Sequence, residues 1–149
     1  MEKIVVGVDG SEQSKNALRF AVAEGEQHHV GVLAVHAWSM PVPSLEIVAT
    51  TPLDYAELFA NVQEGAERML ANLVEGVVQE RQNGVQVEQL AIEGAPAAVL
   101  VETVGDDDLL VVGSRGRGGF ARLLLGSVSE QVARHAPCPV LIHRSSSSG

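Results

Sequence analysis

The chain has 149 residues, of which 46% are hydrophobic and 19% charged, and its formal net charge is −9. This length suits one domain with a substantial core, and this composition argues against disorder. The negative charge argues against nucleic acid as a general partner, because it repels the phosphate backbone. No apolar run approaches the ~20 residues that cross a bilayer, so we expect neither a membrane-spanning nor a nucleic-acid-binding protein.

The first half of the chain alternates apolar runs with helical patterns. Residues 3–9 (KIVVGVD) form a valine-rich run that is typical of a strand buried on both faces of a parallel sheet. The hydroxyl of Ser11 suits the N-cap of a helix that we expect to reach about Gln27. Residues 30–37 (VGVLAVHA) predict a second buried strand. Residues 38–54 contain three prolines and no clear period, which favours a flap or site loop.

The second half continues the alternation, with one long helical pattern, one half-exposed strand near a sheet edge, and shorter elements after them. In chain order we expect a helix from Leu58 to about Asn83, a strand over 85–92, a helix from Pro96 through Val104, a strand over 109–113, a helix over 127–135 and a strand over 138–143. This order predicts an α/β fold with a doubly wound five-stranded parallel sheet, strand order 3-2-1-4-5, and helices on both faces.

The ends of the chain complete the predicted organisation. We expect a single domain over residues 1–144 and a disordered tail over 145–149. The first strand starts almost at Met1, which leaves no room for a signal peptide. The single cysteine, Cys138, fits a reducing compartment and is expected to be a buried structural thiol. The sequence therefore predicts a cytoplasmic protein.

Two expected strands end in distinctive residues. The first runs into Asp9-Gly10-Ser11 and the fourth into Gly113, and the order 3-2-1-4-5 makes them neighbours where the strand order reverses, which is where α/β sheets bind ligands. Three of the ten lysines and arginines fall within 115–122, among glycines that let backbone amides approach a ligand. These features predict a phosphate site. A Walker A motif is excluded because no lysine follows the glycines, and the G-x-G-x-x-A match over 116–121 lacks the acidic residue that would hold a ribose.

One spacing matches a more specific motif. Gly113, two residues, Gly116, nine residues, then Gly126-Ser127 resembles the Gly-2x-Gly-9x-Gly-Ser/Thr motif of ATP-binding universal stress proteins. The opening IVVGVDGSEQSKNALRFA and the ending GSVSEQVARHAPCPVLIHR resemble the same family. The resemblance covers nearly the whole chain and implies the adenine nucleotide alpha hydrolase-like version of the fold. It also implies ATP as the ligand, with or without Mg²⁺.

The resemblance assigns a role to each expected site residue. Asp9 would lie beside the adenosine, Gly7 and Ala37 would form the adenine wall, and Val112 would lie near the ribose. Physically, unpaired amides and the helix dipole favour an anion at the start of the last helix. The residues expected around the phosphates are Gly113, Gly116, Gly126, Ser127 and Val128, with Arg117 and Arg115 as variable contacts.

Structural interpretations of the same residues stay open. Asp9 could only cap the turn into the first helix, Gly113 and Gly116 could be turn glycines, and Ser127 could be only an N-cap. Outside the expected site we interpret Arg122 as solvated or ion-paired, His36 as a packed histidine, His28-His29 as too local for a metal site, and residues 106–108 (DDD) as a solvated turn.

The sequence predicts nucleotide binding but shows no evident set of catalytic residues, since Asp9 is the only carboxylate expected near the pocket and is assigned to the nucleoside. We therefore expect an ATP-binding regulatory protein of the stress response, with at most slow hydrolysis and with no catalytic or metal-binding residues. The alternatives are a slow ATPase or phosphoryl- or nucleotidyl-transfer enzyme, and a dimeric interaction module that binds no nucleotide.

The last strand also predicts an oligomer. In the order 3-2-1-4-5, residues 138–143 form a sheet edge whose apolar side chains and unpaired backbone groups favour pairing with another chain. Pro139 lacks an N–H and is expected at the start of the strand. The family resemblance implies the same antiparallel homodimer.

Overall fold

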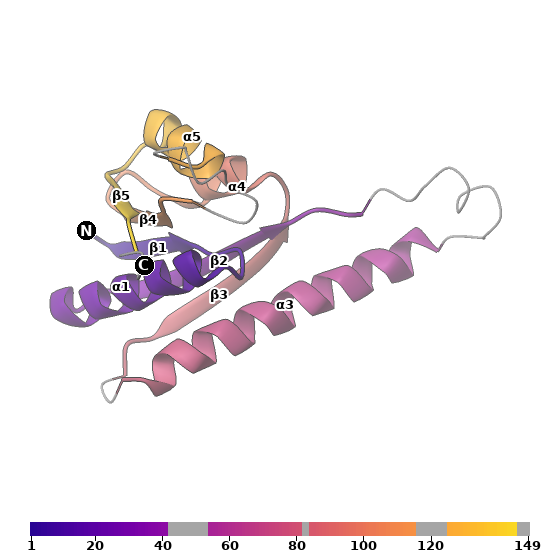
Figure 1. Cartoon of the computed structure of the whole chain (residues 1–149), viewed down its shortest axis with the longest axis horizontal. Helices are drawn as coiled ribbons and strands as arrows, with labels where there is room; N and C mark the ends of the chain where they lie inside the picture. Colours follow the sequence, from indigo (N-terminus) through magenta and orange to yellow (C-terminus); the bar gives the residue numbers. More distant parts are fainter. Residues whose placement is uncertain (42–53, 82–83, 116–124, 146–149) are drawn as a thin grey trace.

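The computed structural model of the chain describes residues 1–41, 54–81, 84–115 and 125–145. In these ranges a five-stranded parallel sheet lies between two layers of helices (Figure 1). The strand order is β3-β2-β1-β4-β5, which confirms the predicted order. The elements are β1 (Lys3–Gly7), α1 (Glu12–His28), β2 (Gly31–Trp38), α3 (Tyr55–Gln79), β3 (Val87–Glu93), α4 (Pro96–Thr103), β4 (Leu109–Gly113), α5 (Ser127–His135) and β5 (Val140–His143).

Alternate residues of the central strands pack into two separate cores. On β1, Ile4 and Val6 pack with α1 and α3, whereas Val5 packs on the face that carries α4 and α5. On β4, Val111 and Leu110 divide in the same way. All five side chains are fully buried, and each contributes roughly 1.5–3 kcal/mol by leaving water. Burial on both faces is the physical reason for the continuous apolar runs in the sequence.

Tertiary pairing moves several element boundaries from their predicted positions. β2 extends to Trp38 because this residue pairs with Glu93 of β3. β5 begins at Val140 and not at residue 138, and Pro139 lies just before the strand, where its carbonyl accepts the Leu110 N–H at 3.0 Å. α3 ends at Gln79, before the predicted end near Asn83.

The interpretation of residues 106–108 as a solvated turn is wrong for Asp108, which is only 5% exposed. One carboxyl oxygen accepts the Gly105 N–H at 2.8 Å and lies 3.7 Å from Nζ of Lys3. Because a buried carboxylate needs such partners, this side chain closes the turn before β4 and ties it to the start of β1. Asp106 and Asp107 are exposed, as expected.

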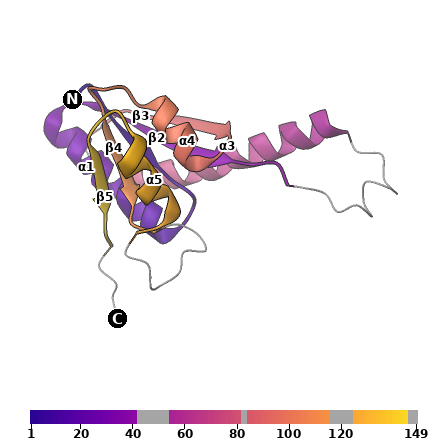
Figure 2. The same cartoon turned by 90° about the horizontal axis from the view of Figure 1, so that it is seen from above.

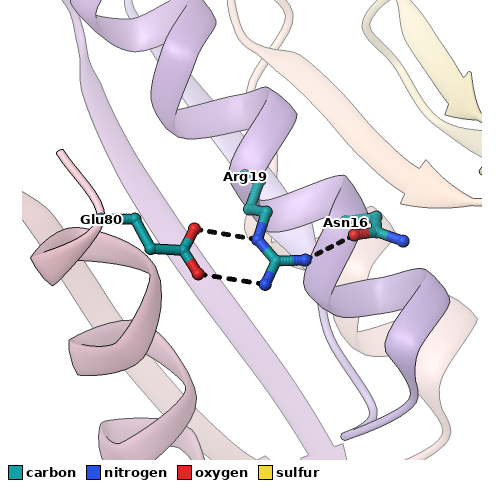
Figure 3. Close-up of polar contacts among 3 residues, drawn as sticks. All are labelled: Asn16, Arg19 and Glu80. Carbon is teal, nitrogen blue, oxygen red and sulfur yellow. Dashed lines mark hydrogen bonds and ion pairs between the residues drawn. The ribbon is translucent and has the colours of Figure 1, made fainter.

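A two-contact ion pair joins α1 to the end of α3. The guanidinium of Arg19 donates through Nε and Nη2 to the two carboxyl oxygens of Glu80, at 3.0 and 3.1 Å (Figure 3). Its Nη1 donates to Oδ1 of Asn16 at 2.6 Å. The hydrogen bond from Arg19 holds the pKa of Glu80 below its ordinary value. The pair links α1 to the end of α3 on the face of the sheet that carries both helices.

The first turns of α3 extend past the sheet, beside the end of β2 (Figures 1 and 2). Here the indole of Trp38 donates to Gln63 and its ring meets Phe59 edge-on, with centroids 5.0 Å apart. Tyr55 and Phe59 are exposed. None of the helices in the described ranges has an apolar stretch long enough to cross a bilayer.

Candidate functional site

The two strand ends that the sequence singled out are neighbours in the structure. β1 and β4 pair directly, with Val6 opposite Val111. Because all strands are parallel, their carboxyl ends share one edge of the sheet, and the turns after Gly7 and Gly113 lie at that edge. The strand order reverses between these two strands, and a parallel α/β sheet places its ligand crevice at this point.

The turn after β1 is held by its own hydrogen bonds. Oδ1 of Asp9 accepts the Ser11 N–H at 2.9 Å, and Gly10 between them has φ of 86°, which an L side chain rarely adopts. The Asp9 N–H donates to Oγ of Ser14 at 3.2 Å. One carboxyl oxygen of Asp9 therefore has the turn-capping role that the sequence left open as an alternative, and the turn fixes this side chain at the edge.

The start of α1 is capped by a side chain, as predicted. Oγ of Ser11 accepts the Ser14 N–H at 3.1 Å, and the hydroxyl of Ser14 donates to the Ser11 carbonyl at 3.0 Å. The buried Ser14 thus links the cap to the turn after β1. The first-turn amide at this position has its acceptor within the protein.

The end of β4 packs against the first turn of α1. Oε1 of Gln13 accepts the backbone N–H of Arg115 at 3.2 Å and lies 3.4 Å from the hydroxyl of Ser114. A Cβ added to Gly113 would lie 3.5 Å from the backbone of Gln13 and from the Arg115 carbonyl. These are ordinary van der Waals distances, so position 113 lies beside the first turn of α1 with room for a Cβ.

The start of α5 differs from that of α1, because its N-cap residue has no side chain that could accept a first-turn N–H. Gly126 is the N-cap, with φ of −74° and ψ of 169°, and α5 has no side-chain cap hydrogen bond. The alternative that Ser127 is the N-cap is wrong: Ser127 is the first helical residue, and it is exposed. Val128 follows it, half-buried. An uncapped helix N-terminus is a favourable position for an anion.

Ser114 joins both ends of the connection between β4 and α5. Its carbonyl accepts the Gly126 N–H at 2.6 Å and the hydroxyl of Ser129 at 3.2 Å, and its own N–H donates to the His143 carbonyl at 3.0 Å. Ser114 and Ser129 are both buried. The chain that leaves β4 at Ser114 therefore returns to the same point at Gly126.

The residues assigned to the adenine and ribose lie at or near the carboxyl ends of β2, β1 and β4. Ala37 is the next-to-last residue of β2, and Gly7 ends β1. Gly7 packs under Leu100, whose Cδ1 would be 2.8 Å from an added Cβ, and beside Val112, whose side chain is only 3% exposed. The side chain of Val112 thus belongs to the core.

Sequence analysis gave no role at this edge to four residues that shape it. Gln13, Ser114 and Ser129 hold the β4–α5 connection, as described above. His36 donates through Nδ1 to the Val8 carbonyl at 2.9 Å, which holds the backbone just before Asp9 and confirms that it is a packed histidine. The contacts of Gln13 join residues about a hundred positions apart, so local sequence carries no signal for them.

Three residues assigned to or near the site, Gly116, Arg117 and Arg122, lie outside the described ranges, as does most of the predicted loop over 38–54. Among the described residues, no three or more His, Cys, Asp or Glu side chains are placed to hold a metal ion. His28 pairs instead with Glu24, at 3.3 Å. Cys138 is buried, and burial raises the pKa of its thiol, which agrees with a structural role.

Comparison with known proteins identifies the family. The family model described as the universal stress protein family matches residues 1–144. The chain belongs to the universal stress protein family. A curated universal stress protein of Mycobacterium tuberculosis is 41% identical over 143 residues, which are 96% of this chain and 45% of the relative. The chain thus spans about half the length of the curated relatives it matches.

Solved structures of universal stress proteins share the fold. UspA from Lactobacillus plantarum superposes with a TM-score of 0.76 at 21% identity, covering 96% of this chain and 97% of that one. A universal stress protein crystallised in complex with cAMP gives a TM-score of 0.65 at 26% identity, covering 96% of each chain. The adenine nucleotide alpha hydrolase-like fold that the resemblance implied is thereby confirmed.

Proposed function

We propose that this universal stress protein binds ATP at the carboxyl-end edge of β1 and β4, and that the bound nucleotide regulates its contacts with other proteins in the stress response. One observation carries the proposal: the uncapped start of α5 is held beside the glycine turn after β4 by the 2.6 Å hydrogen bond from the Gly126 N–H to the Ser114 carbonyl. The relative in complex with cAMP supports an adenine nucleotide as the ligand.

The phosphates are assigned to the start of α5. There the amides of Ser127 and Val128 and the positive end of the helix dipole favour an anion. Each such interaction is worth ~0.3–1 kcal/mol when exposed and up to ~2 kcal/mol when sheltered. Together with the nucleoside contacts below, they are the basis for the low-micromolar affinity that we predict. Gly116 and Arg117, together with Arg115, complete the proposed phosphate contacts, and Mg²⁺ would arrive with the nucleotide.

The nucleoside is assigned to the ends of β1 and β2. Asp9 is fixed at the edge by its bond from the Ser11 N–H, so its carboxylate is in place for a ribose hydroxyl or a base amine. Gly7 and Ala37, at the ends of neighbouring strands, are assigned to the wall of the base. Val112 contributes its backbone, since its side chain is buried.

We propose binding rather than rapid catalysis. Phosphoryl transfer needs a base or a positioned water near the terminal phosphate. The carboxylate that follows β1, Asp9, is assigned to the nucleoside and bonds the turn. A slow ATPase remains the second candidate function, and steady turnover of ATP by the purified protein, lost when Asp9 is replaced by Asn, would favour it.

The test of the binding proposal starts from protein stripped of nucleotide. Titration calorimetry with ATP should give saturable binding in the low-micromolar range, and GTP should bind more weakly. Mass spectrometry of the unstripped protein should find an adenine nucleotide. Absence of heat and of saturation at millimolar ATP would overturn the proposal.

We also propose that the chain forms a homodimer through β5. This strand is a sheet edge, and its residues Val140–His143 are all half-buried. An apolar edge with unpaired backbone groups favours pairing with a second copy about a two-fold axis. Light scattering at high micromolar concentration should give twice the monomer mass of 15.7 kDa, and a monomer mass would contradict the proposal.

A further inference from the structure

The side chain of Gln13 connects the rigid first turn of α1 to the loop that leaves β4. Its Oε1 accepts the Arg115 N–H at 3.2 Å and lies 3.4 Å from the Ser114 hydroxyl. The residues it joins are 101 and 102 positions away in the chain. Of the two contacts, the shorter one holds Arg115, the last described residue after β4, against the first turn of α1.

The helix that carries Gln13 is well anchored. Ser11 caps its start, and Arg19 pairs with Glu80 through two contacts (Figure 3). The loop end is anchored as well, since the carbonyl of Ser114 accepts the Gly126 N–H and the Ser129 hydroxyl. A side chain that links these two parts restrains the end of β4 relative to the first turn of α1.

We propose that Gln13 is a positioning residue for the phosphate-binding loop. It acts by holding the Arg115 amide, and its contact with the Ser114 hydroxyl restrains the residue whose carbonyl accepts the Gly126 N–H at the start of α5. The inference rests on the proposed function, because it assumes that phosphate binds there. Its consequence is specific: Gln13 determines affinity for the phosphates and leaves affinity for the nucleoside unchanged.

The experiment compares ATP with adenosine on three variants. Gln13→Ala removes the acceptor, Gln13→Glu keeps both acceptor positions but adds a negative charge, and Gln27→Ala is the matched control, an exposed glutamine on the same helix. Calorimetry measures both ligands at two salt concentrations. Hydrogen exchange of the Arg115 amide reports the loop contact directly.

Gln13→Ala should weaken ATP binding about tenfold, the value of one net hydrogen bond of ~1.4 kcal/mol, and change adenosine binding less than about twofold. Its Arg115 amide should exchange faster. Gln13→Glu should keep the slow exchange but bind ATP more weakly at low salt than at high salt, because the repulsion of the phosphates is screened. Gln27→Ala should behave as the wild type.

The outcomes separate the two proposals. If wild-type protein binds no ATP, the proposed function fails. If it binds ATP and Gln13→Ala binds ATP equally well, only the positioning role is overturned. A loss of ATP and adenosine affinity by the same factor would also overturn it, because it would mean that Gln13 supports the fold in general.

Discussion

Two helices begin at the ligand edge of this sheet, and their first turns are built differently. At the start of α1, Ser11 accepts the Ser14 N–H, and the Ser14 hydroxyl returns a bond to the Ser11 carbonyl. At the start of α5, Gly126 provides no side chain for the same purpose. Each helix start carries the positive end of a helix dipole, and α1 satisfies a first-turn amide with its N-cap side chain, whereas the N-cap of α5 has none. This difference is the basis on which we propose α5, and not α1, as the position of the phosphates.

The largest expected effect comes from giving α5 a cap. Gly126 has φ of −74° and ψ of 169°, which any L residue can adopt, so Gly126→Asp should place a carboxylate over the first-turn amides. ATP affinity should fall about a hundredfold or more, since ~3 kcal/mol of anion interactions would be replaced by repulsion. Thermal stability should be kept or rise by a few tenths of a kcal/mol. If calorimetry showed unchanged ATP affinity, the proposed difference between the starts of α1 and α5 would be contradicted.

The next effect concerns the distance between the β4 turn and α1. A Cβ on Gly113 would make ordinary contacts of 3.5 Å with Gln13 and Arg115, so Gly113→Ala should change ATP affinity little. The branched side chain of Gly113→Val has no such room and should push the turn off α1, weakening ATP binding about tenfold. Calorimetry on both variants checks this, and equal affinities would show that the turn can move without harm to the site.

Sequence patterns predicted the fold because its determinants are local. Doubly buried strands read as continuous apolar runs such as residues 3–9, and Pro96 marks the first residue of α4, as expected. The ends of strands were predicted less well, because they depend on pairing with a neighbouring strand. Trp38 belongs to β2 because of Glu93, and nothing in the local sequence shows that pairing.

The local features of the candidate site could be predicted from the sequence, whereas its tertiary contacts could not. The sequence predicted that the ends of β1 and β4 are neighbours and that Ser11 caps α1, and the structure shows both. The burial of Asp108 depends on Lys3, more than a hundred residues away, and the clamp of Gln13 on Arg115 is equally distant. Such contacts form only when the folded sheet brings these distant residues together, so the local sequence does not predict them.

Smaller effects are expected from two serine substitutions, one at the start of α1 that affects protein stability and one at the start of α5 that affects ATP binding. Ser11→Ala removes the α1 cap and should cost ~1 kcal/mol of unfolding free energy, with ATP affinity within about twofold of wild type. Ser127→Ala removes an exposed hydroxyl at the first position of α5, where it can donate to the assigned phosphates, and should do the reverse, lowering ATP affinity with little change in stability. Denaturant titration and calorimetry measure the two quantities. If both variants lost stability alone, α5 would be framework as well.

The smallest effect depends on pH. The bond from Arg19 lowers the pKa of Glu80, so its stabilisation is fully present above the ordinary pKa and is lost as pH falls through the lowered, folded-state value. Glu80→Gln should therefore melt slightly below wild type at pH 7, and the two proteins should converge in acid. ATP affinity at pH 7 should not change. A melting difference that stayed constant down to acid pH would exclude the ion pair as its source.

The most direct test of the account follows backbone amides by NMR while ATP is added to stripped, isotope-labelled protein. The account predicts that the amide resonances of Ser127 and Val128 shift most and saturate with the calorimetric affinity, while that of Ser14, which already donates to Ser11, shifts little. A titration in which Ser14 moved and Ser127 and Val128 did not would contradict the assignment of the phosphates to α5.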